Sequence, residues 1–380
     1  MNLKDFKVER YFARHEFTAK YLLSSSDCDG YSMNYVLDLA SSEEKERWDT
    51  LTLGYTETVG SEPLRTAIQQ HYTTIGLDEI VVSSPGEANF VLMNVLLHAG
   101  DHVICMSPMY QSLYQVAKDL GCAVSFWQAS TDNNQWYYDP ADLKKLITSN
   151  TKLIVINFPH NPTGFNPSLD DYEEIIEIAR QSGVTLFSDE MYRFLNHDGH
   201  ALPSACDLYE NAVSLWGTAK TFGLAGLRLG WLTSKNKALL KKVESFKDYL
   251  SICNSAASEI LATIALNNID QFVIPNVDKI KANILLFEQF HHRHPAFFDF
   301  LKPNSGSTAF IKLKIKETAM DFAENLVKET GIMLLPSEAF EFGSRHARIG
   351  FGRRNMRQAL DLLGVYLMGK KISAGKEVNL

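Results

Sequence analysis

The chain has 380 residues, of which 45% are hydrophobic, and this length allows a large buried core divided between two domains. Its formal net charge of −8 argues against binding to nucleic acid or to an anionic membrane surface. No apolar run reaches the roughly 18 residues that span a bilayer, and the charged N-terminal stretch lacks the apolar segment of a signal peptide.

The first elements are an amphipathic helix, predicted over residues 2–20, and a polar loop at residues 24–30. From about residue 46, short apolar runs alternate with helical patterns. The runs predicted as strands are 80–82, 102–106, 123–127, 153–158, 184–187, 212–216 and 229–232. The stretches predicted as helices are 87–98, 112–120, 169–181 and 239–265. This alternation favours a mostly parallel sheet that helices cover on both faces.

A long helix predicted over 273–292 leads into a second region. This region has predicted strands at 309–315 and 347–351 and predicted helices at 317–330 and 356–367. The sequence therefore predicts an α/β fold with two domains. The large domain comprises residues 46–272, and a smaller α+β domain comprises residues 1–45 and 273–380.

The five cysteines are scattered and lack the spacing of metal ligands. We expect reduced thiols in a cytoplasmic enzyme without a metal site.

Four side chains fall at or just beyond the ends of predicted strands: Tyr110, Asn161, Asp189 and Lys220. In parallel sheets, ligands gather at the carboxyl ends of the strands. We therefore expect these side chains to share one site.

Residues 217–230 place Lys220 eight residues before Arg228, with glycines at 223, 226 and 230. A lysine that forms a Schiff base needs a close, rigid setting, and a phosphate group favours a planar, forked cation. Pyridoxal 5′-phosphate requires both groups, one for its aldehyde and one for its phosphate. The alternative, two solvated surface charges, fits poorly with the apolar runs 213–216 and 227–232.

This segment resembles the class I/II aminotransferases, which are pyridoxal-phosphate enzymes of fold type I. Four further segments resemble that family in the same order: 54–65, 108–110, 157–164 and 188–192. Residues 157–164 and 248–250 also resemble capreomycidine synthase, a family relative that cyclises a hydroxylated arginine. The resemblance extends from Tyr55 to Arg348 and implies pyridoxal phosphate as the cofactor.

The resemblance also implies roles for the matched residues. Lys220 would form the internal aldimine and then move a proton between the substrate Cα and the cofactor, while Asp189 would keep the pyridine nitrogen protonated. Asn161 and Tyr192 would bind the ring oxygen. The other implied cofactor contacts are Arg228 at the phosphate, Tyr110 on the ring face, and Gly86, Glu87, Thr218 and Tyr55. In the family, the residue matched by Tyr55 reaches the phosphate of the neighbouring subunit, which implies a homodimer.

The phosphate-binding segments depart from the family pattern. Gly217 and Ala219 stand where hydroxyl residues are usual, so Thr218 is the hydroxyl left nearby. Residues 83–88 replace the usual glycine-alanine-threonine start of a helix, and Pro85 has no N–H to donate. The amides of Gly86 and Glu87 still lie at a predicted helix N-terminus, where anions bind.

For the substrate, the resemblance implies that Arg348 grips the α-carboxylate, with Asn161 and Gly30 beside it. It implies an aminotransferase that moves an amino group from an L-amino acid to a 2-oxo acid. The activity of another fold type I enzyme remains an alternative, namely a cyclase of the capreomycidine synthase kind, a lyase or an oxidase. All of these enzymes use the same lysine, aspartate and arginine. Asp27 and Asp29 leave open whether the loop attracts a cationic substrate side chain or is a solvated acidic loop.

Overall fold

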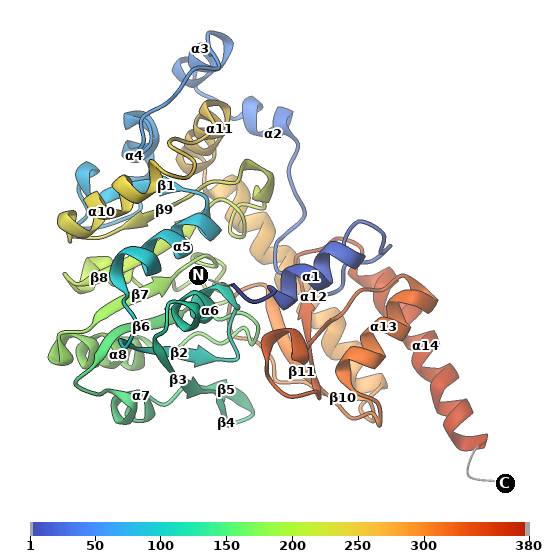
Figure 1. The fold of residues 1–380 in the computed structure, drawn as a ribbon. Helices are drawn as coiled ribbons and strands as arrows, with labels where there is room; N and C mark the ends of the chain where they lie inside the picture. Colours follow the sequence, from blue (N-terminus) through green and yellow to red (C-terminus); the bar gives the residue numbers. More distant parts are fainter. Residues whose placement is uncertain (1–2, 377–380) are drawn as a thin grey trace.

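The protein is described here by a computed structural model that covers residues 3–376, with side chains to residue 369. The ends of the predicted small domain, residues 1–2 and 377–380, fall outside the described residues. Two β-sheets lie side by side (Figure 1). The large sheet has the order β1-β9-β8-β7-β6-β2-β3. Its strands are β1 (Ile80–Ser83), β2 (His102–Ser107), β3 (Ala123–Gln128), β6 (Thr151–Asn157), β7 (Thr185–Asp189), β8 (Ala212–Gly217) and β9 (Gly230–Thr233).

The large sheet is mostly parallel, as the sequence predicts. Strands β3, β2, β6, β7 and β8 are parallel neighbours, and β9 pairs antiparallel with both β8 and β1. Every residue of β7 and β8 is buried, which explains why the strands appear in the sequence as unbroken apolar runs. The predicted α/β fold class is confirmed.

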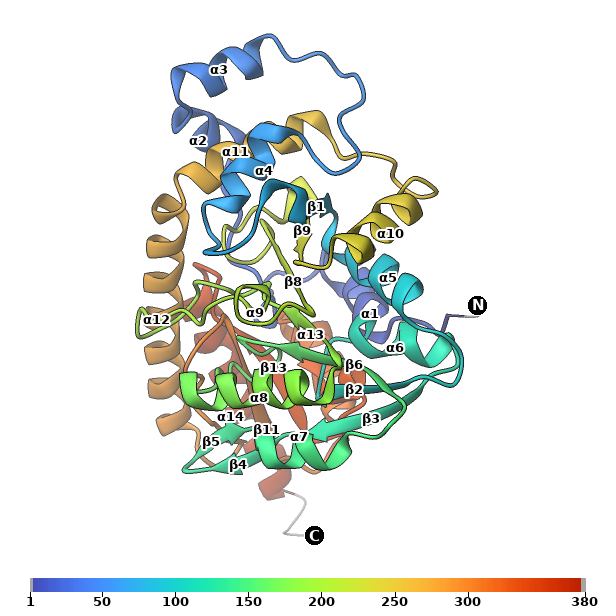
Figure 2. The ribbon, with the colours of Figure 1, turned by 90° about the vertical axis from the view of Figure 1, so that its left-hand side faces the viewer.

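Helices cover both faces of this sheet: α7 and α8 lie on one side, and α5, α6 and α10 lie on the other (Figures 1 and 2). The helices of this part are α4 (Glu62–Gln69), α5 (Pro85–Leu96), α6 (Ser112–Asp119), α7 (Pro140–Leu146), α8 (Leu169–Ser182), α9 (Ala205–Leu208), α10 (Lys237–Lys247) and α11 (Ala256–Asn267). Helix α8 has clear local signals at both ends. The Ser168 side chain accepts a hydrogen bond from the Asp171 amide, and Gly183 ends the helix at a φ of 64°.

Two predicted helices differ from the structure. The stretch 239–265 is broken into α10 and α11, because Ile252 has a φ of 64° and Ser255 caps a new helix. The N-terminal helix is shorter than predicted: α1 comprises only Lys7–His15. Beyond it the chain turns so that Tyr21 pairs with Ile332.

The small sheet is antiparallel, with the order β10-β11-β13-β12. Its strands are β10 (Phe298–Asp299), β11 (Thr308–Leu313), β12 (Leu335–Pro336) and β13 (His346–Gly350). The helices around it are α12 (Asp270–Arg293), α13 (Ala319–Thr330) and α14 (Met356–Lys376), with the 3₁₀ helix η3 (Ser337–Phe340). A separate hairpin joins β4 (Ser130–Asp132) and β5 (Gln135–Tyr137), and two further 3₁₀ helices are η1 (Leu77–Glu79) and η2 (Ala225–Leu227).

The N-terminal segment contacts both halves of the molecule. Helix α1 packs against η3 of the small sheet, whereas α2 (Met33–Asp38) and α3 (Ser42–Asp49) pack against α11. The predicted domain boundaries near residues 46 and 272 stay a prediction.

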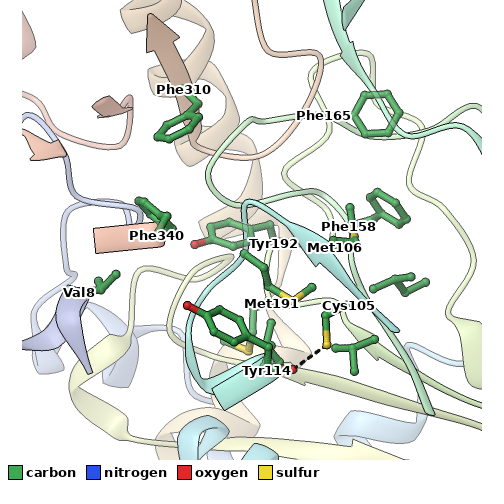
Figure 3. Close-up of a cluster of buried hydrophobic side chains, with 14 of the residues drawn as sticks. Val8, Cys105, Met106, Tyr114, Phe158, Phe165, Met191, Tyr192, Phe310 and Phe340 are labelled. Atoms are coloured by element: carbon green, nitrogen blue, oxygen red, sulfur yellow. Dashed lines mark hydrogen bonds between the residues drawn. The ribbon is translucent and has the colours of Figure 1, made fainter. Parts of the chain in front are cut away.

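One buried hydrophobic cluster joins the two sheets. It includes Met106 and Tyr192 of the large-sheet side, Phe310 and Phe340 of the small-sheet side, and Val8 of α1 (Figure 3). The burial of these apolar side chains stabilises the packing of the two halves and of α1 between them. Within residues 3–376, every helix is too short or too polar to cross a lipid bilayer, and all five cysteines are free thiols.

Candidate active site

A cavity of about 380 Å³ lies where strands of the large sheet end and the small sheet approaches. Asn157 and Asp189 are the last residues of β6 and β7, and Arg348 comes from β13 of the other sheet. The predicted site residues that line this cavity are Gly86, Tyr110, Asn161, Asp189, Tyr192, Lys220, Arg228 and Arg348. The structure therefore brings together the four strand-end side chains and both predicted arginines.

Lys220 lies three residues beyond the end of β8, and its Nζ donates a hydrogen bond to Ser26 Oγ at 3.0 Å. The strand before it approaches its neighbour closely: a Cβ on Gly217 would lie 2.8 Å from the Cα of Gly230 and 2.9 Å from the carbonyl oxygen of Leu229. Gly217 therefore has no room for the hydroxyl side chain usual at this position. The close packing of β8 and β9 gives Lys220 a rigid base.

Asp189 is buried at the end of β7, where its carboxylate accepts a hydrogen bond from the Met191 amide at 3.1 Å. Burial raises the pKa of this carboxyl from 3.8 to about 7, although the Met191 amide and the charge of Lys220 both act in the opposite direction. The carboxyl is thus poorly stabilised as an anion by the protein alone. A cationic group placed against it would favour its charged form.

Arg348 is only 2% exposed, and two of its donors are fixed by the chain. Its Nε donates to the carbonyl oxygen of Ser24 at 2.9 Å, and its Nη1 donates to Asn161 Oδ1 at 3.0 Å. Burial lowers the pKa of the guanidinium. A guanidinium has five N–H donors, so this arrangement orients Arg348 and leaves donors for a carboxylate in the cavity.

Tyr110 and Tyr192 are aromatic side chains of the cavity wall. The Tyr110 hydroxyl donates to Glu9 Oε1 of α1 at 2.5 Å. Burial and the negative charge of Glu9 raise the pKa of Tyr110 well above its usual range. This bond ties α1 to the wall of the cavity.

At the other end of the cavity, Arg228 and Gly86 are lining residues. Gly86 and Glu87 belong to the first turn of α5, whose amides have no partner within the helix. The Glu87 side chain points elsewhere and accepts hydrogen bonds from Ser83 Oγ at 3.0 Å and Ser251 Oγ at 2.7 Å. The predicted anion contacts that the structure offers here are the Arg228 guanidinium and these amides.

Four predicted site residues do not line the cavity of their own chain: Glu87, whose side chain is described above, and Thr218, Gly30 and Tyr55. The Thr218 hydroxyl is buried and donates to the carbonyl oxygen of Leu229 at 3.0 Å. Gly30 packs beside the lysine segment, where an added Cβ would lie 3.6 Å from the carbonyl oxygen of Gly223. Tyr55 is 88% exposed.

On the N-terminal side of the cavity, the sequence drew attention to Asp27 but not to the other lining residues. Val8, Glu9, Phe12 and Glu16 line it from α1 and its end, together with Ser26 and Asp27 from the following loop. Because 3.6 residues make one helical turn, positions 8, 9, 12 and 16 share one face. Two carboxylates beside two apolar residues on one helix face are the signal in the sequence that could have indicated this wall.

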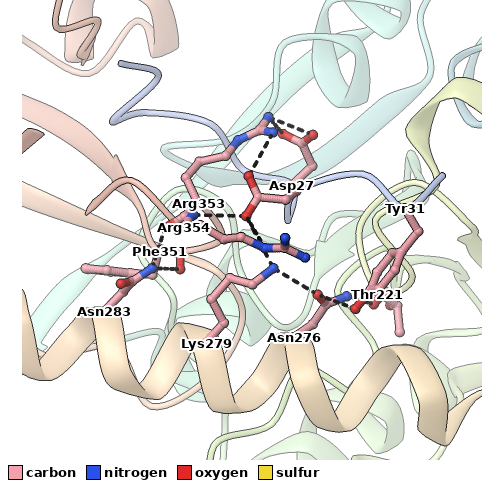
Figure 4. A network of polar contacts seen from close by, with 10 residues as sticks. Asp27, Tyr31, Thr221, Asn276, Lys279, Asn283, Phe351, Arg353 and Arg354 are labelled. Carbon is pink, nitrogen blue, oxygen red and sulfur yellow. Dashed lines mark hydrogen bonds and ion pairs between the residues drawn. The ribbon is translucent and has the colours of Figure 1, made fainter. Parts of the chain in front are cut away.

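A polar network holds the loop after Ser26 in place (Figure 4). Arg353 Nη2 donates to both carboxylate oxygens of Asp27 at 3.0 and 3.1 Å. Asp29 pairs with Lys279 of α12 at 3.4 Å and accepts from the Arg354 amide at 2.9 Å. Of the two acidic residues for which a cationic partner or a solvated loop was left open, Asp27 lines the cavity and Asp29 does not.

The chain is similar to several known proteins. The chain matches the family model described as aminotransferase class I and II over residues 18–363. It is 27% identical to capreomycidine synthase of Streptomyces vinaceus, over 98% of this chain and 96% of that protein. It is also 27% identical to an aspartate aminotransferase of Sulfurisphaera tokodaii, over 84% of this chain and 85% of that protein. The crystal structure of a PLP-dependent aminotransferase from Streptococcus suis 89-1591 superimposes with a TM-score of 0.90 at 28% identity, over 97% of this chain and 98% of that one.

Proposed function

The chain belongs to the aminotransferase class I and II family, and from this premise we propose that it transfers an amino group from an L-amino acid to a 2-oxo acid. The cofactor of the family is pyridoxal 5′-phosphate, which supplies an aldehyde that condenses with amines and a ring that accepts electrons from Cα. The observation that carries the proposal is the single cavity lined by Lys220, Asp189 and Arg348.

The donor set of the cavity fits the polar parts of this cofactor. Lys220 offers the amine for the aldehyde. Asp189, whose pKa burial raises to about 7, gains a cationic partner in the ring nitrogen. The Arg228 guanidinium and the free amides at the start of α5 offer donors to the phosphate.

The remaining residues of the set bind or cover the ring. Asn161 and Tyr192 are the proposed contacts of its oxygen, and Tyr110 is the proposed contact of its face. Asn161 is well placed for this because its backbone amide donates to Asn157 Oδ1 at 2.9 Å, which fixes the loop after β6.

Substrate recognition is assigned to Arg348. Its planar guanidinium binds the α-carboxylate through two parallel hydrogen bonds, since Ser24 and Asn161 already hold it in one orientation. With the substrate held in this way, the Lys220 amine would be the base that takes and returns the proton of the substrate Cα. Ser26 accepts a hydrogen bond from Lys220 Nζ when the amine is free, and Val8 and Phe12 exclude water from the cavity.

We also propose that the enzyme acts as a homodimer. Tyr55 is 88% exposed and absent from the cavity of its own chain, and the nearby Leu53 is 89% exposed. Large exposed apolar side chains of this kind favour a partner surface, and Tyr55 would reach the phosphate in the partner subunit. Sedimentation of the holoenzyme tests this, and a fully active monomer would contradict it.

A single-turnover reaction tests the proposed transamination. The holoenzyme is mixed with one L-amino acid at a time, without any 2-oxo acid, and cofactor and product are identified by mass spectrometry. Transamination leaves one equivalent of pyridoxamine 5′-phosphate and one of 2-oxo acid, because the amino group stays with the cofactor.

The same experiment addresses a second candidate, a cyclase. It is favoured by the similarity to capreomycidine synthase, which covers 98% of this chain. A cyclase or lyase lets electrons leave towards Cβ or Cγ and regenerates the aldehyde form of the cofactor. Product with only pyridoxal 5′-phosphate recovered, for every amino acid that reacts, would contradict the aminotransferase assignment.

A further inference from the structure

The cavity wall opposite the large sheet carries negative charge. Glu9, Glu16 and Asp27 all line it, and they come from α1, from its C-terminal end and from the loop beyond Ser26. Glu9 accepts the hydrogen bond of Tyr110, and Asp27 is paired with Arg353. Within the described residues, the half-buried Glu16 carboxylate has neither a hydrogen bond nor an ion pair.

The surroundings of Glu16 favour a cation beside it. Burial raises the pKa of Glu16, and the negative charges of Asp27 and Glu9 raise it further, against smaller opposing contributions from Arg353 and Lys220. An added positive charge at this point would relieve both the burial and the repulsion.

A neutral acceptor in the same cavity also lacks a donor. Asn89 is 3% exposed, and its Nδ2 donates to Ser112 Oγ at 3.2 Å, which assigns Oδ1 as the acceptor end. In the described part of the chain, this Oδ1 has no hydrogen-bond partner. A buried acceptor without a donor is costly, so Asn89 independently indicates a ligand that donates hydrogen bonds.

The cations that line the cavity do not neutralise Glu16. Among the described lining residues they are Lys220, Arg228 and Arg348. Under the proposed function, these three are matched by the cofactor aldehyde, its phosphate and the substrate α-carboxylate. None of these three cations is then left to pair with the Glu16 carboxylate.

We infer that the amino donor carries a cationic side chain, a guanidinium or an ammonium group, and that Glu16 binds it with Asp27 as a further acceptor. The inference rests on the proposed function, because it places the α-carboxylate at Arg348 and the side chain towards α1. A substrate with an acidic side chain would meet repulsion from the same wall.

Matched amino acids test the charge directly. L-arginine is compared with L-citrulline, and L-lysine with L-norleucine, because each pair differs mainly in side-chain charge. The dissociation constant of each is measured by calorimetry on the holoenzyme and on its Glu16→Gln variant. Glu46→Gln, which removes an exposed carboxylate of α3 outside the cavity, is the matched control.

We expect the unaltered holoenzyme to bind the charged member of at least one pair about tenfold more tightly than the neutral one, as for a charge-assisted hydrogen bond. Glu16→Gln should remove most of this preference, and Glu46→Gln should keep it. Glu16→Lys should reverse it. The pair that responds distinguishes a guanidinium from an ammonium substrate.

Equal affinity within both pairs would overturn the inference, and so would a preference that persists unchanged in Glu16→Gln. The comparison measures binding and requires no turnover. A holoenzyme that prefers the cationic member through Glu16 but never yields pyridoxamine 5′-phosphate would contradict the proposed transamination and leave this inference standing.

Discussion

The buried carboxyl of Asp189 should destabilise the cofactor-free protein at neutral and alkaline pH. Its pKa is raised from 3.8 to about 7 in the folded state, so the folded protein holds this proton more tightly than the unfolded chain. The destabilisation by Asp189 is therefore absent below about pH 4. It grows as the pH rises from about 4 to about 7 and keeps its largest value above pH 7. The difference between 3.8 and about 7, at about 1.4 kcal/mol for each pH unit, gives up to about 4 kcal/mol.

Asp189→Asn removes the charge and keeps an oxygen that accepts the Met191 amide. Without cofactor, the variant should exceed the unaltered protein in free energy of unfolding by up to about 4 kcal/mol at pH 8, and by nearly nothing at pH 4. Urea unfolding of both cofactor-free proteins between pH 4 and 8 measures this difference. Since the ring nitrogen is the proposed partner of Asp189, the variant should also bind pyridoxal phosphate more weakly.

The adjacent buried acid is the control. Glu190 accepts hydrogen bonds from Ser204 Oγ at 2.8 Å and from the Ala205 amide at 3.0 Å. Glu190→Gln replaces one acceptor with a donor, so it should lose about 1–3 kcal/mol at pH 8. A stability difference between Asp189→Asn and the unaltered protein that does not change from pH 4 to pH 8 would refute the reasoning about Asp189.

Three other predictions concern the residues of this cavity and the close packing of β8 against β9 below Lys220. Borohydride reduction of the holoenzyme should label Lys220 in peptide mapping, and a label on another lysine would contradict the central assignment. Arg348→Ala should lose about 2–5 kcal/mol of transition-state stabilisation with amino acids and far less with simple amines, and equal losses in kcat/KM would indicate a different arginine. Gly217→Ala should lower the free energy of unfolding by about 1–3 kcal/mol, because its Cβ would lie 2.8 Å from Gly230 Cα. Gly54→Ala, with no atom within 4 Å of its added Cβ, should change stability far less.

The large sheet could be predicted from the sequence because its strands are buried on both faces. Runs such as 212–216 contain only apolar and small residues, and turn residues separate them, so the pattern marks a strand without any tertiary information. The side chains at the strand ends, Asp189 and Lys220, follow from the same pattern, because parallel strands end at one edge.

Other features depend on packing that no local pattern records. Ile252 adopts a positive φ between α10 and α11, which its residue type does not indicate. Glu9 and Glu16 face the cavity only because α1 packs against η3, far away in the sequence. The Thr218 hydroxyl lies near the lysine in sequence, yet the turn between β8 and β9 directs it to the Leu229 carbonyl oxygen. The roles of the individual site residues stay predictions that the experiments above test.

Two different parts of the chain line the cavity, and this has a consequence for protein engineering. The proposed cofactor contacts Asp189 and Lys220 lie at or just beyond the ends of strands of the large sheet. The wall proposed to face the substrate comes from residues 8–27 and from Arg348 of the small sheet. Exchanging residues 8–27 for the corresponding segment of a relative should change which amino donor is accepted. The cofactor affinity should be retained if Glu9 and Ser26 are kept, because they bond Tyr110 and Lys220. Substrate preference could thus be altered through the N-terminal segment while the residues at the strand ends of the large sheet are left unchanged.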